Sequence, residues 1–245
     1  MNDLVESIRE RYLSTLEKIA VAANHVGRDP ESVKLVVVTK TQSIEIVRAV
    51  IDAGVHILGE NYPEEGVTKL KSLHGVSAVE WHMIGHVQSR KAQMVAENFN
   101  LLHSLDSLKL AQRLDRFCGA AGRCLPVLLE FNLGGEESKS GWLASDEIPG
   151  SALMDDLSAI IALPNLQVCG LMVMPPLGIA AELSRPYFQK LKCLQEYLTS
   201  QFPKVDFSEL SMGTSSDFEV AVQEGATLVR VGTAIVGARQ YKTEV

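Results

Sequence analysis

The spacing of apolar residues divides the chain into one long helical segment followed by alternating strand-like and helix-like segments. Residues 2–26 carry apolar side chains every three or four positions, which is the period of one helix face. This stripe consists of Leu4, Ile8, Tyr12, Leu16, Ile19, Ala23 and Val26. Gly27 ends the pattern, and the stretch GRDPES that follows is typical of a turn. The pattern therefore predicts an N-terminal helix over about residues 2–26.

Eight short apolar runs follow, and amphipathic helix-like stretches lie between them. The runs span residues 34–40, 56–61, 80–85, 101–106, 126–133, 167–174, 208–213 and 228–235. Their apolarity is continuous rather than alternating, which is typical of a parallel sheet covered by helices. Eight strand–helix units in 245 residues favour a single (β/α)8 TIM barrel, one domain over residues 1–245. A doubly wound open sheet is the alternative, but no GxGxxG turn follows the first strand.

Composition narrows the functional classes. The net charge of -7 gives no electrostatic support to a general role on nucleic acid or membrane surfaces. The first 20 residues are charged throughout, unlike a signal peptide, and no apolar run approaches the ~20 residues that span a bilayer. The four cysteines form no CxxC pair and the histidines are scattered, so we expect neither a disulfide framework nor a metal site. We expect a cytoplasmic protein and, since no long apolar segment lies outside the barrel pattern, a monomer.

Lys40 stands where the first strand should end. If Val36, Val38 and Lys40 share one face of that strand, Lys40 lies at the top of a column inside the barrel. Active sites in such barrels lie at the carboxyl ends of the strands. An amine in apolar surroundings loses solvation, which favours the neutral nucleophile that forms a Schiff base. A surface lysine next to a helix cap is the alternative.

The end of the seventh strand, LSMGTSSD, suits a phosphate group. Ser211 and Thr214 supply hydroxyls, Gly213 allows close approach of the backbone, and a helix-like segment follows. A capped turn is the commoner use of such residues and is the alternative.

The eighth strand, in VRVGTAIVGAR, adds a cation and a second phosphate-compatible turn. Its parity directs Arg230 into the barrel and leaves Gly232 and Thr233 at the rim. An unpaired buried charge costs several kcal/mol, roughly, so Arg230 requires a partner. The alternative to a ligand is an ion pair with a core carboxylate such as Glu60 or Glu130.

Several other positions carry weaker signals. Residues 134–142 lack the GK[ST] ending of a phosphate-binding Walker A loop, and we interpret them as a loop over the mouth with Lys139 as a second anion contact. His82 and His86 lack ligand partners at metal spacing, so hydrogen-bonded core or rim histidines are expected. Asn61, at the end of the second strand, either reaches a ligand or bonds its own backbone.

The motifs resemble those of a known family over nearly the whole chain. They are VTKTQ, GENY, WHMIGHVQSRK, EESKSGW, GLMVMPP and LSMGTSSDFEVAVQEGATLVRVGTAIVGAR, in this order. They resemble the pyridoxal phosphate homeostasis proteins, the YggS/PROSC-like family. The resemblance implies one barrel similar to the N-terminal domain of alanine racemase, preceded by a helix.

The resemblance also implies a cofactor and its binding residues. Lys40 would carry pyridoxal 5'-phosphate (PLP) as a Schiff base, Arg230 would face the pyridine nitrogen, and Asn61 would lie beside the ring. The phosphate would be held by four residues of the last two strands, namely Ser211, Gly213, Gly232 and Thr233. The implied role is to bind, buffer and deliver PLP in vitamin B6 homeostasis, with PLP-dependent apoenzymes as possible recipients and no catalytic turnover.

Two enzymatic functions are the alternatives. A PLP-dependent racemase fits Arg230, because alanine racemase resembles this arrangement. Such an enzyme adds a C-terminal β-domain and a second base, whereas this chain ends at Val245. A barrel aldolase that uses Lys40 without cofactor suits the phosphate-compatible turns but not the family motifs. The carrier is therefore the function we expect.

Overall fold

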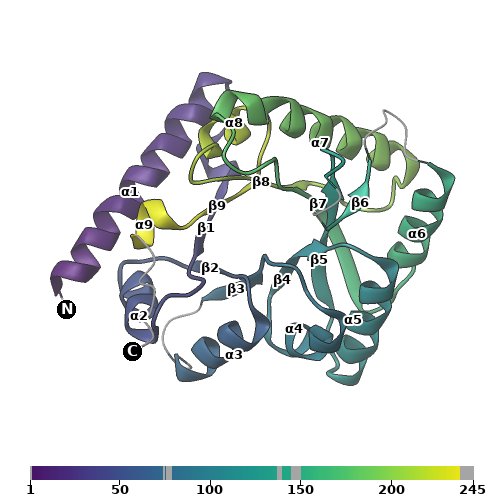
Figure 1. Ribbon diagram of the computed structural model, residues 1–245, viewed down its shortest axis with the longest axis horizontal. Coiled ribbons are helices and arrows are strands. Elements are labelled where there is room, and N and C mark those ends of the chain that lie inside the picture. Colours follow the sequence, from purple (N-terminus) through teal and green to yellow (C-terminus); the bar gives the residue numbers. More distant parts are fainter. Residues whose placement is uncertain (1, 74, 76–78, 137–139, 145–149, 238–245) are drawn as a thin grey trace.

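A ring of parallel strands forms the centre of the molecule (Figure 1). The computed structural model describes residues 2–73, 75, 79–136, 140–144 and 150–237. The ring strands are β1 (Lys34–Val38), β2 (Ile57–Glu60), β3 (Glu80–Met83), β4 (Leu101–Leu105), β5 (Leu125–Asn132), β7 (Leu166–Val173), β8 (Glu209–Thr214) and β9 (Leu228–Val231). A short strand, β6 (Trp142–Leu143), pairs with the end of β5 outside the ring.

The strands follow one another around the ring in sequence order, and every pair is parallel. β1 pairs with β2 on one side and with β9 on the other, and the pairing of β4 with β5 completes the closure. Closure removes the free strand edges that an open sheet would expose. The predicted (β/α)8 barrel is confirmed, and the open sheet is excluded.

Helices surround the ring on its outside (Figure 1). They are α1 (Asn2–His25), α2 (Ile44–Asp52), α3 (Pro63–Ser72), α4 (Ala92–Asn98), α5 (Leu108–Ala120), α6 (Ser151–Ile161), α7 (Ala181–Gln201), α8 (Phe218–Gln223) and α9 (Thr233–Val236), with 3-10 turns η1 (Pro30–Ser32) and η2 (Ser89–Lys91). Local signals set several of their starts. Ser43 caps α2 by accepting from the Ile46 N–H, and Pro63 occupies the first turn of α3, where its missing N–H costs nothing.

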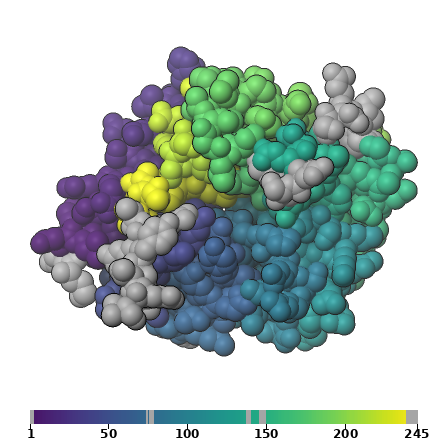
Figure 2. Space-filling view, viewed as in Figure 1, coloured from purple at the N-terminus to yellow at the C-terminus, as the bar shows by residue number. Residues whose placement is uncertain are grey.

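The apolar core has two layers. The larger layer lies between the strands and the helices, and the smaller one lies inside the ring. The buried members of the inner layer are Val36, Leu101, Leu128, Met172 and Leu228. The space-filling view along the same direction shows side chains closing most of the middle of the ring, with α9 in yellow on this face (Figure 2). The barrel is therefore packed rather than hollow.

The predicted N-terminal helix is confirmed as α1, which packs against α2, α8 and α9. The stripe is buried at Ile8, Ile19 and Ala23, whereas Leu4 in the first turn and Val26, which follows the helix, are exposed.

Several strand boundaries differ from the prediction, and two of the strand ends bear on the site. β1 ends at Val38 rather than residue 40, and the last strand ends at Val231 rather than residue 235. After Val231 the backbone turns at Gly232, and α9 begins at Thr233. Apolar runs do not mark these ends, because the residues after each strand are still partly buried. Lys139 lies outside the described residues, so its predicted role as a second anion contact stays a prediction.

Two further observations bear on the chemistry of the chain. The four cysteines, all within the described ranges, are free thiols. Among the described helices, none combines the length and apolarity that crossing a bilayer requires.

Candidate functional site

The residues predicted from the sequence come from four neighbouring strands. Lys40 follows β1, Asn61 follows β2, Ser211 and Gly213 lie on β8, and Arg230, Gly232 and Thr233 lie on or after β9. These strands are adjacent in the order β2-β1-β9-β8. Since all of them are parallel, their carboxyl ends meet at one mouth of the barrel. The fold therefore gathers at one end residues that are up to 193 positions apart in the chain, from Lys40 to Thr233.

Lys40 is half-buried at this mouth, two residues beyond β1. Thr39 is fully buried, and its N–H donates to the Gly59 carbonyl at 3.0 Å, which continues the β1–β2 ladder. Thr41 has a φ of 62°, the left-handed region that β-branched residues rarely adopt. The backbone around Lys40 is thus anchored on one side and strained on the other.

Four buried carboxylate and amide oxygens have no hydrogen-bond partner among the described residues. They are Glu60 Oε2, Asn61 Oδ1, Glu130 Oε2 and Asn132 Oδ1. They lie in the last three residues of β2 and β5 or, in the case of Asn61, directly after β2. Buried polar groups are nearly always bonded, so a group of them at one end indicates a place for water or a polar ligand. This end is the one at which Lys40 lies.

Arg230 points into the ring, as its parity predicted. Its guanidinium donates to the Ser211 hydroxyl oxygen, to the Val173 carbonyl at 3.1 Å and to Met174 Sδ at 2.9 Å. Burial lowers the pKa of Arg230 to about 10, and the charges of Asp217 and Glu130 oppose that shift. Among the described residues, Arg230 forms no ion pair with a carboxylate.

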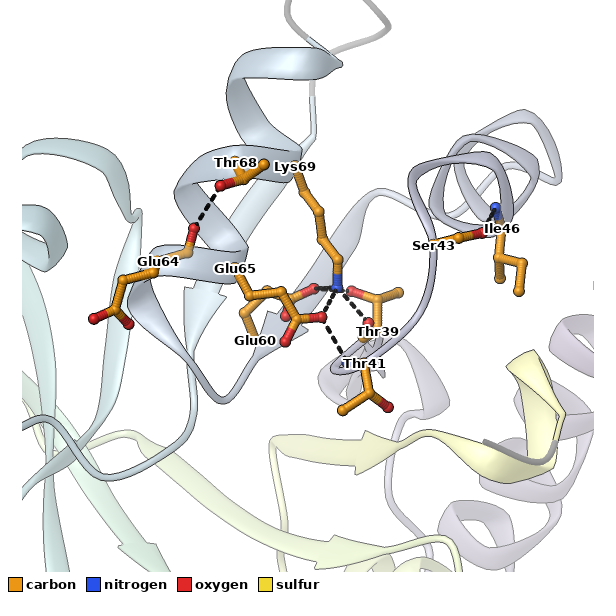
Figure 3. Close-up of polar contacts among 9 residues, drawn as sticks. All are labelled: Thr39, Thr41, Ser43, Ile46, Glu60, Glu64, Glu65, Thr68 and Lys69. Atoms are coloured by element: carbon orange, nitrogen blue, oxygen red, sulfur yellow. Dashed lines mark hydrogen bonds and ion pairs between the residues drawn. The ribbon is translucent and has the colours of Figure 1, made fainter. Parts of the chain in front are cut away.

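The two carboxylates considered as partners of Arg230 behave differently. Glu60 bonds to Thr39 and Lys69 instead (Figure 3). Glu130 affects Arg230 only through its charge. Burial raises the pKa of Glu130 to about 7, and the nearby charge of Asp106 adds to that rise. The guanidinium is therefore held by neutral acceptors, an arrangement compatible with an anionic or electron-rich ligand at the mouth.

A chain of hydrogen bonds continues from Arg230 through the ring. The Ser211 hydroxyl lies 2.7 Å from His103 Nδ1, His103 Nε2 lies 3.0 Å from His82 Nδ1, and His82 Nε2 lies 3.2 Å from Glu80 Oε2. Burial lowers the pKa of His103 well below its ordinary value, as do the charges of His82 and Arg230. Arg230 at one end of this chain can only donate, and the Glu80 carboxylate at the other end can only accept.

His103 was not singled out from the sequence, although its parity in LLHSLD matches that of inward-facing Leu101. His82 is buried and bonded, and His86 lies at the rim, 2.8 Å from Asp106 Oδ2. Both match the expectation of hydrogen-bonded core and rim histidines. Within the described ranges, no group of His, Cys, Asp or Glu side chains could hold a metal ion.

The phosphate-compatible turns bring hydroxyls and glycines together at the ends of β8 and β9. Ser211 is fully buried and pairs in register with Leu228, one layer below the rim. Ser215 is the hydroxyl beside Gly232, since its Oγ accepts from the Gly232 N–H at 3.2 Å. A Cβ at Gly213 would lie 2.6 Å from Ala221 Cβ, so α8 occupies the space that the glycine leaves. Thr233 is exposed at the rim.

Comparisons with known proteins give a consistent picture. A family model described as the N-terminal domain of alanine racemase matches residues 15–240. The pyridoxal phosphate homeostasis protein of Vibrio alginolyticus is 38% identical over 240 residues, which cover 97% of this chain and 100% of that protein.

Solved structures extend the likeness to three dimensions. PipY of Synechococcus elongatus PCC7942 without PLP has a TM-score of 0.81 at 36% identity, and PipY with PLP bound has a TM-score of 0.79 at 35% identity. Both matches cover 94% of this chain and 100% of PipY. Alanine racemase of Clostridium difficile 630 is 14% identical with a TM-score of 0.66, and the match spans 57% of that enzyme, which demonstrates a shared fold alone.

Proposed function

The chain belongs to the family of pyridoxal phosphate homeostasis proteins, and from that premise we propose that it binds PLP at the barrel mouth with Lys40 as the attachment residue. The observation that carries the proposal is the likeness to PipY, whose structure with PLP bound matches 94% of this chain at 35% identity. The position of Lys40 at the carboxyl end of β1 supports it, because barrel enzymes and binding proteins use this end.

The residues at the mouth fit such a cofactor. Asn61 Oδ1 and Asn132 Oδ1 are buried acceptors without a partner among the described residues, and Arg230 is a buried cation bonded to neutral acceptors. An elongated polar ligand with one anionic end would satisfy groups of both kinds. In an apolar barrel without a ligand, these groups would be a net cost.

We assign the binding roles as follows. Gly232 and Thr233 contact the phosphate, and Ser215 joins them, because its hydroxyl already lies against the Gly232 N–H. Asn61 lies beside the ring, and Arg230 faces the pyridine nitrogen. Ser211 acts indirectly, because its hydroxyl oxygen accepts a hydrogen bond from the Arg230 guanidinium. Gly213 acts by allowing α8 to pack against the turn.

These residues favour holding PLP over using it in turnover. Bound PLP supplies an aldehyde with which a lysine amine condenses, losing one water molecule. An arginine beside the pyridine nitrogen disfavours its protonation, because the guanidinium remains charged. The ring is then a weaker electron sink than in enzymes that place a carboxylate there. Arg230 is held in place by three acceptors, so this setting persists.

The function that follows is intracellular PLP homeostasis without catalytic turnover. In this role the protein buffers the cofactor and passes it to PLP-dependent apoenzymes, as a cytoplasmic monomer. The position of Lys40 supports exchange, because the residue is only half-buried.

The test is the visible absorbance of the purified protein before and after borohydride reduction. Wild type and the control Lys34→Ala, at the opposite end of β1, should show a yellow band that reduction abolishes; Lys40→Ala should lack it. Mass spectrometry should place the reduced adduct on Lys40. A colourless wild type that takes up no added PLP would overturn the cofactor assignment, and an adduct on another lysine would overturn the attachment residue.

PLP binding by further variants tests the phosphate contacts, and a racemisation assay tests the absence of turnover. Ser215→Ala should weaken PLP binding by about tenfold, roughly 1.4 kcal/mol, whereas the exposed neighbour Ser216→Ala should not. Interconversion of D- and L-alanine at an enzyme-like rate, lost in Lys40→Ala, would replace the carrier by a racemase.

A further inference from the structure

A second lysine, Lys69 on α3, lies buried directly behind the Lys40 loop. Its side chain is 3% exposed, and its ammonium has three hydrogen-bond partners. They are the Thr39 carbonyl at 2.6 Å, Glu60 Oε1 at 2.8 Å and Glu65 Oε1 at 2.6 Å. Figure 3 shows Lys69 reaching down from α3 to the point where these three acceptors converge. A lysine ammonium has three N–H donors, so this set uses all of them and leaves the amine unavailable as a nucleophile.

The same two carboxylates also bind the backbone and side chains on either side of Lys40. The Thr39 hydroxyl donates to Glu60 Oε1 at 2.6 Å, and the Thr41 N–H donates to Glu65 Oε1 at 2.6 Å. Together with the bond from Lys69 to the Thr39 carbonyl, both neighbours of Lys40 are tied to one cluster (Figure 3). We call Lys69, Glu60 and Glu65 the clamp.

The clamp holds a backbone conformation that is unfavourable by itself. Thr41 is the only non-glycine residue with a positive φ among the described residues, at 62°. A β-branched side chain in this region crowds its own backbone, so the conformation persists only when the surroundings hold it. The bond from the Thr41 N–H to Glu65 is such a restraint, and Lys69 in turn orients the Glu65 carboxylate.

Stability alone does not account for the clamp. Burial raises the pKa of Glu60, and the charge of Lys69 and the hydrogen bonds from Lys69 and Thr39 only partly oppose this rise. Glu60 Oε2 has no partner among the described residues. A buried ion pair is often no more stabilising than apolar side chains of similar volume. A costly, incompletely satisfied cluster next to a strained loop indicates a functional restraint.

We propose that Lys69 is a positioning residue that holds Thr39, Lys40 and Thr41 in the strained conformation required for PLP attachment at Lys40. Lys69 touches neither cofactor nor reacting atoms and acts through Glu65 and the Thr39 carbonyl. This inference rests on the proposed function of Lys40, and it assigns to α3 a task that neither the family match nor the motifs specify. Without the clamp, the loop relaxes, Lys40 samples several orientations, and attachment becomes slower and weaker.

The experiment compares two variants of the clamp with two controls on the same helix. Lys69→Met removes the cation at similar length, and Lys71→Met is its exposed control. Glu65→Ala removes the acceptor of the Thr41 N–H, and Glu64→Ala, which breaks only the surface pair with Lys91, is its control. Each purified protein is titrated with PLP by absorbance, and PLP release is timed after dilution. Circular dichroism establishes that each variant is folded at the assay temperature.

We expect Lys69→Met and Glu65→Ala to bind PLP about tenfold more weakly than wild type and to release it faster, with both controls unchanged. Glu65 is partly exposed, so we expect Glu65→Ala to fold. This variant therefore tests the proposal even where Lys69→Met fails to fold. A purely structural role is distinguished by the double variant Lys69→Met with Thr41→Gly. Glycine adopts a φ near 62° without strain, so PLP affinity should recover at least about threefold while the loss in melting temperature remains.

The outcomes separate the two proposals. A wild type that forms no reducible PLP adduct would overturn the proposed function itself. The positioning role alone would be overturned by a different result. In that result the wild type forms the adduct, and the folded Lys69→Met and Glu65→Ala variants bind and release PLP as the wild type does. A double variant that recovers stability but not affinity would also overturn it.

Discussion

At the scale of single residues, Glu130 shows how the barrel interior changes the acidity of a carboxyl group. It shares the inward parity of Leu128 on β5, and burial raises its pKa from 4.5 to about 7. Below about pH 4.5 the group is protonated in both folded and unfolded chains and has no effect on relative stability. As the pH rises from 4.5 to 7, the unfolded chain ionises first, so the folded state is progressively penalised, and above 7 the penalty is constant.

Glu130→Gln should therefore stabilise the ligand-free protein at pH 8 and have little effect at pH 4.5. The expected gain at pH 8 is at most roughly 3 kcal/mol, because the pKa rises by about 2.5 units and one unit corresponds to about 1.4 kcal/mol. Urea unfolding at the two pH values measures it, with the exposed Glu196→Gln on α7 as control. An equal effect of Glu130→Gln at both pH values would show that its ionisation does not penalise the fold.

At the scale of elements, the approach of neighbouring strands imposes strict limits at a few positions. Gly170 on β7 pairs with Glu209 on β8, and a Cβ at Gly170 would lie 1.8 Å from the Glu209 carbonyl oxygen. Gly170 also lies where the β5–β7 register shifts. Any side chain at this position must push the two strands apart and break their ladder.

Gly170→Ala should lower the free energy of unfolding by roughly 2–4 kcal/mol. Chemical denaturation with a circular dichroism readout tests this, and Gln167→Ala, exposed on the same strand, should change stability by less than about 0.5 kcal/mol. Similar stabilities for the two variants would mean that β7 and β8 separate locally at little cost.

At the scale of the whole molecule, α1 connects the start of the chain to its end. It packs against α2, α8 and α9, which flank the seam between β1 and β9 (Figure 1). The Arg11 side chain donates to the Ile235 carbonyl at 2.6 Å, which ties α1 to α9. These contacts support the prediction that α1 and the barrel form a single domain.

If α1 and the barrel form one cooperative unit, Ile19→Ala should destabilise both together by roughly 2–5 kcal/mol. Unfolding followed by circular dichroism should coincide with unfolding followed by the fluorescence of Trp81 on β3 and Trp142 on β6. Leu13→Ala, exposed on the same helix, is the control. A shift in the circular dichroism transition without a matching shift in fluorescence would show that α1 unfolds separately.

The sequence pattern was sufficient to predict the elements of the barrel. Each of the eight predicted strands overlaps an observed strand of the ring, because a run of apolar residues and the turn after it are local features. It was also sufficient to predict the inward parity of Arg230, since strand side chains alternate with a period of two. Strand ends were less accurate, since the last predicted strand continued to residue 235, whereas β9 ends at Val231 and α9 begins at Thr233.

The sequence by itself therefore determined the order of elements, the barrel and the mouth at which Lys40 lies, because each depends on periodicity along the chain. The tertiary structure alone decided which side chains meet across the ring. His103 joins Ser211 over 108 positions, and Lys69 reaches Thr39 over 30. Such pairs depend on strand stagger and on how each helix rotates against the ring, and no local pattern encodes either. For the same reason, Ser215 rather than Ser211 lies beside Gly232.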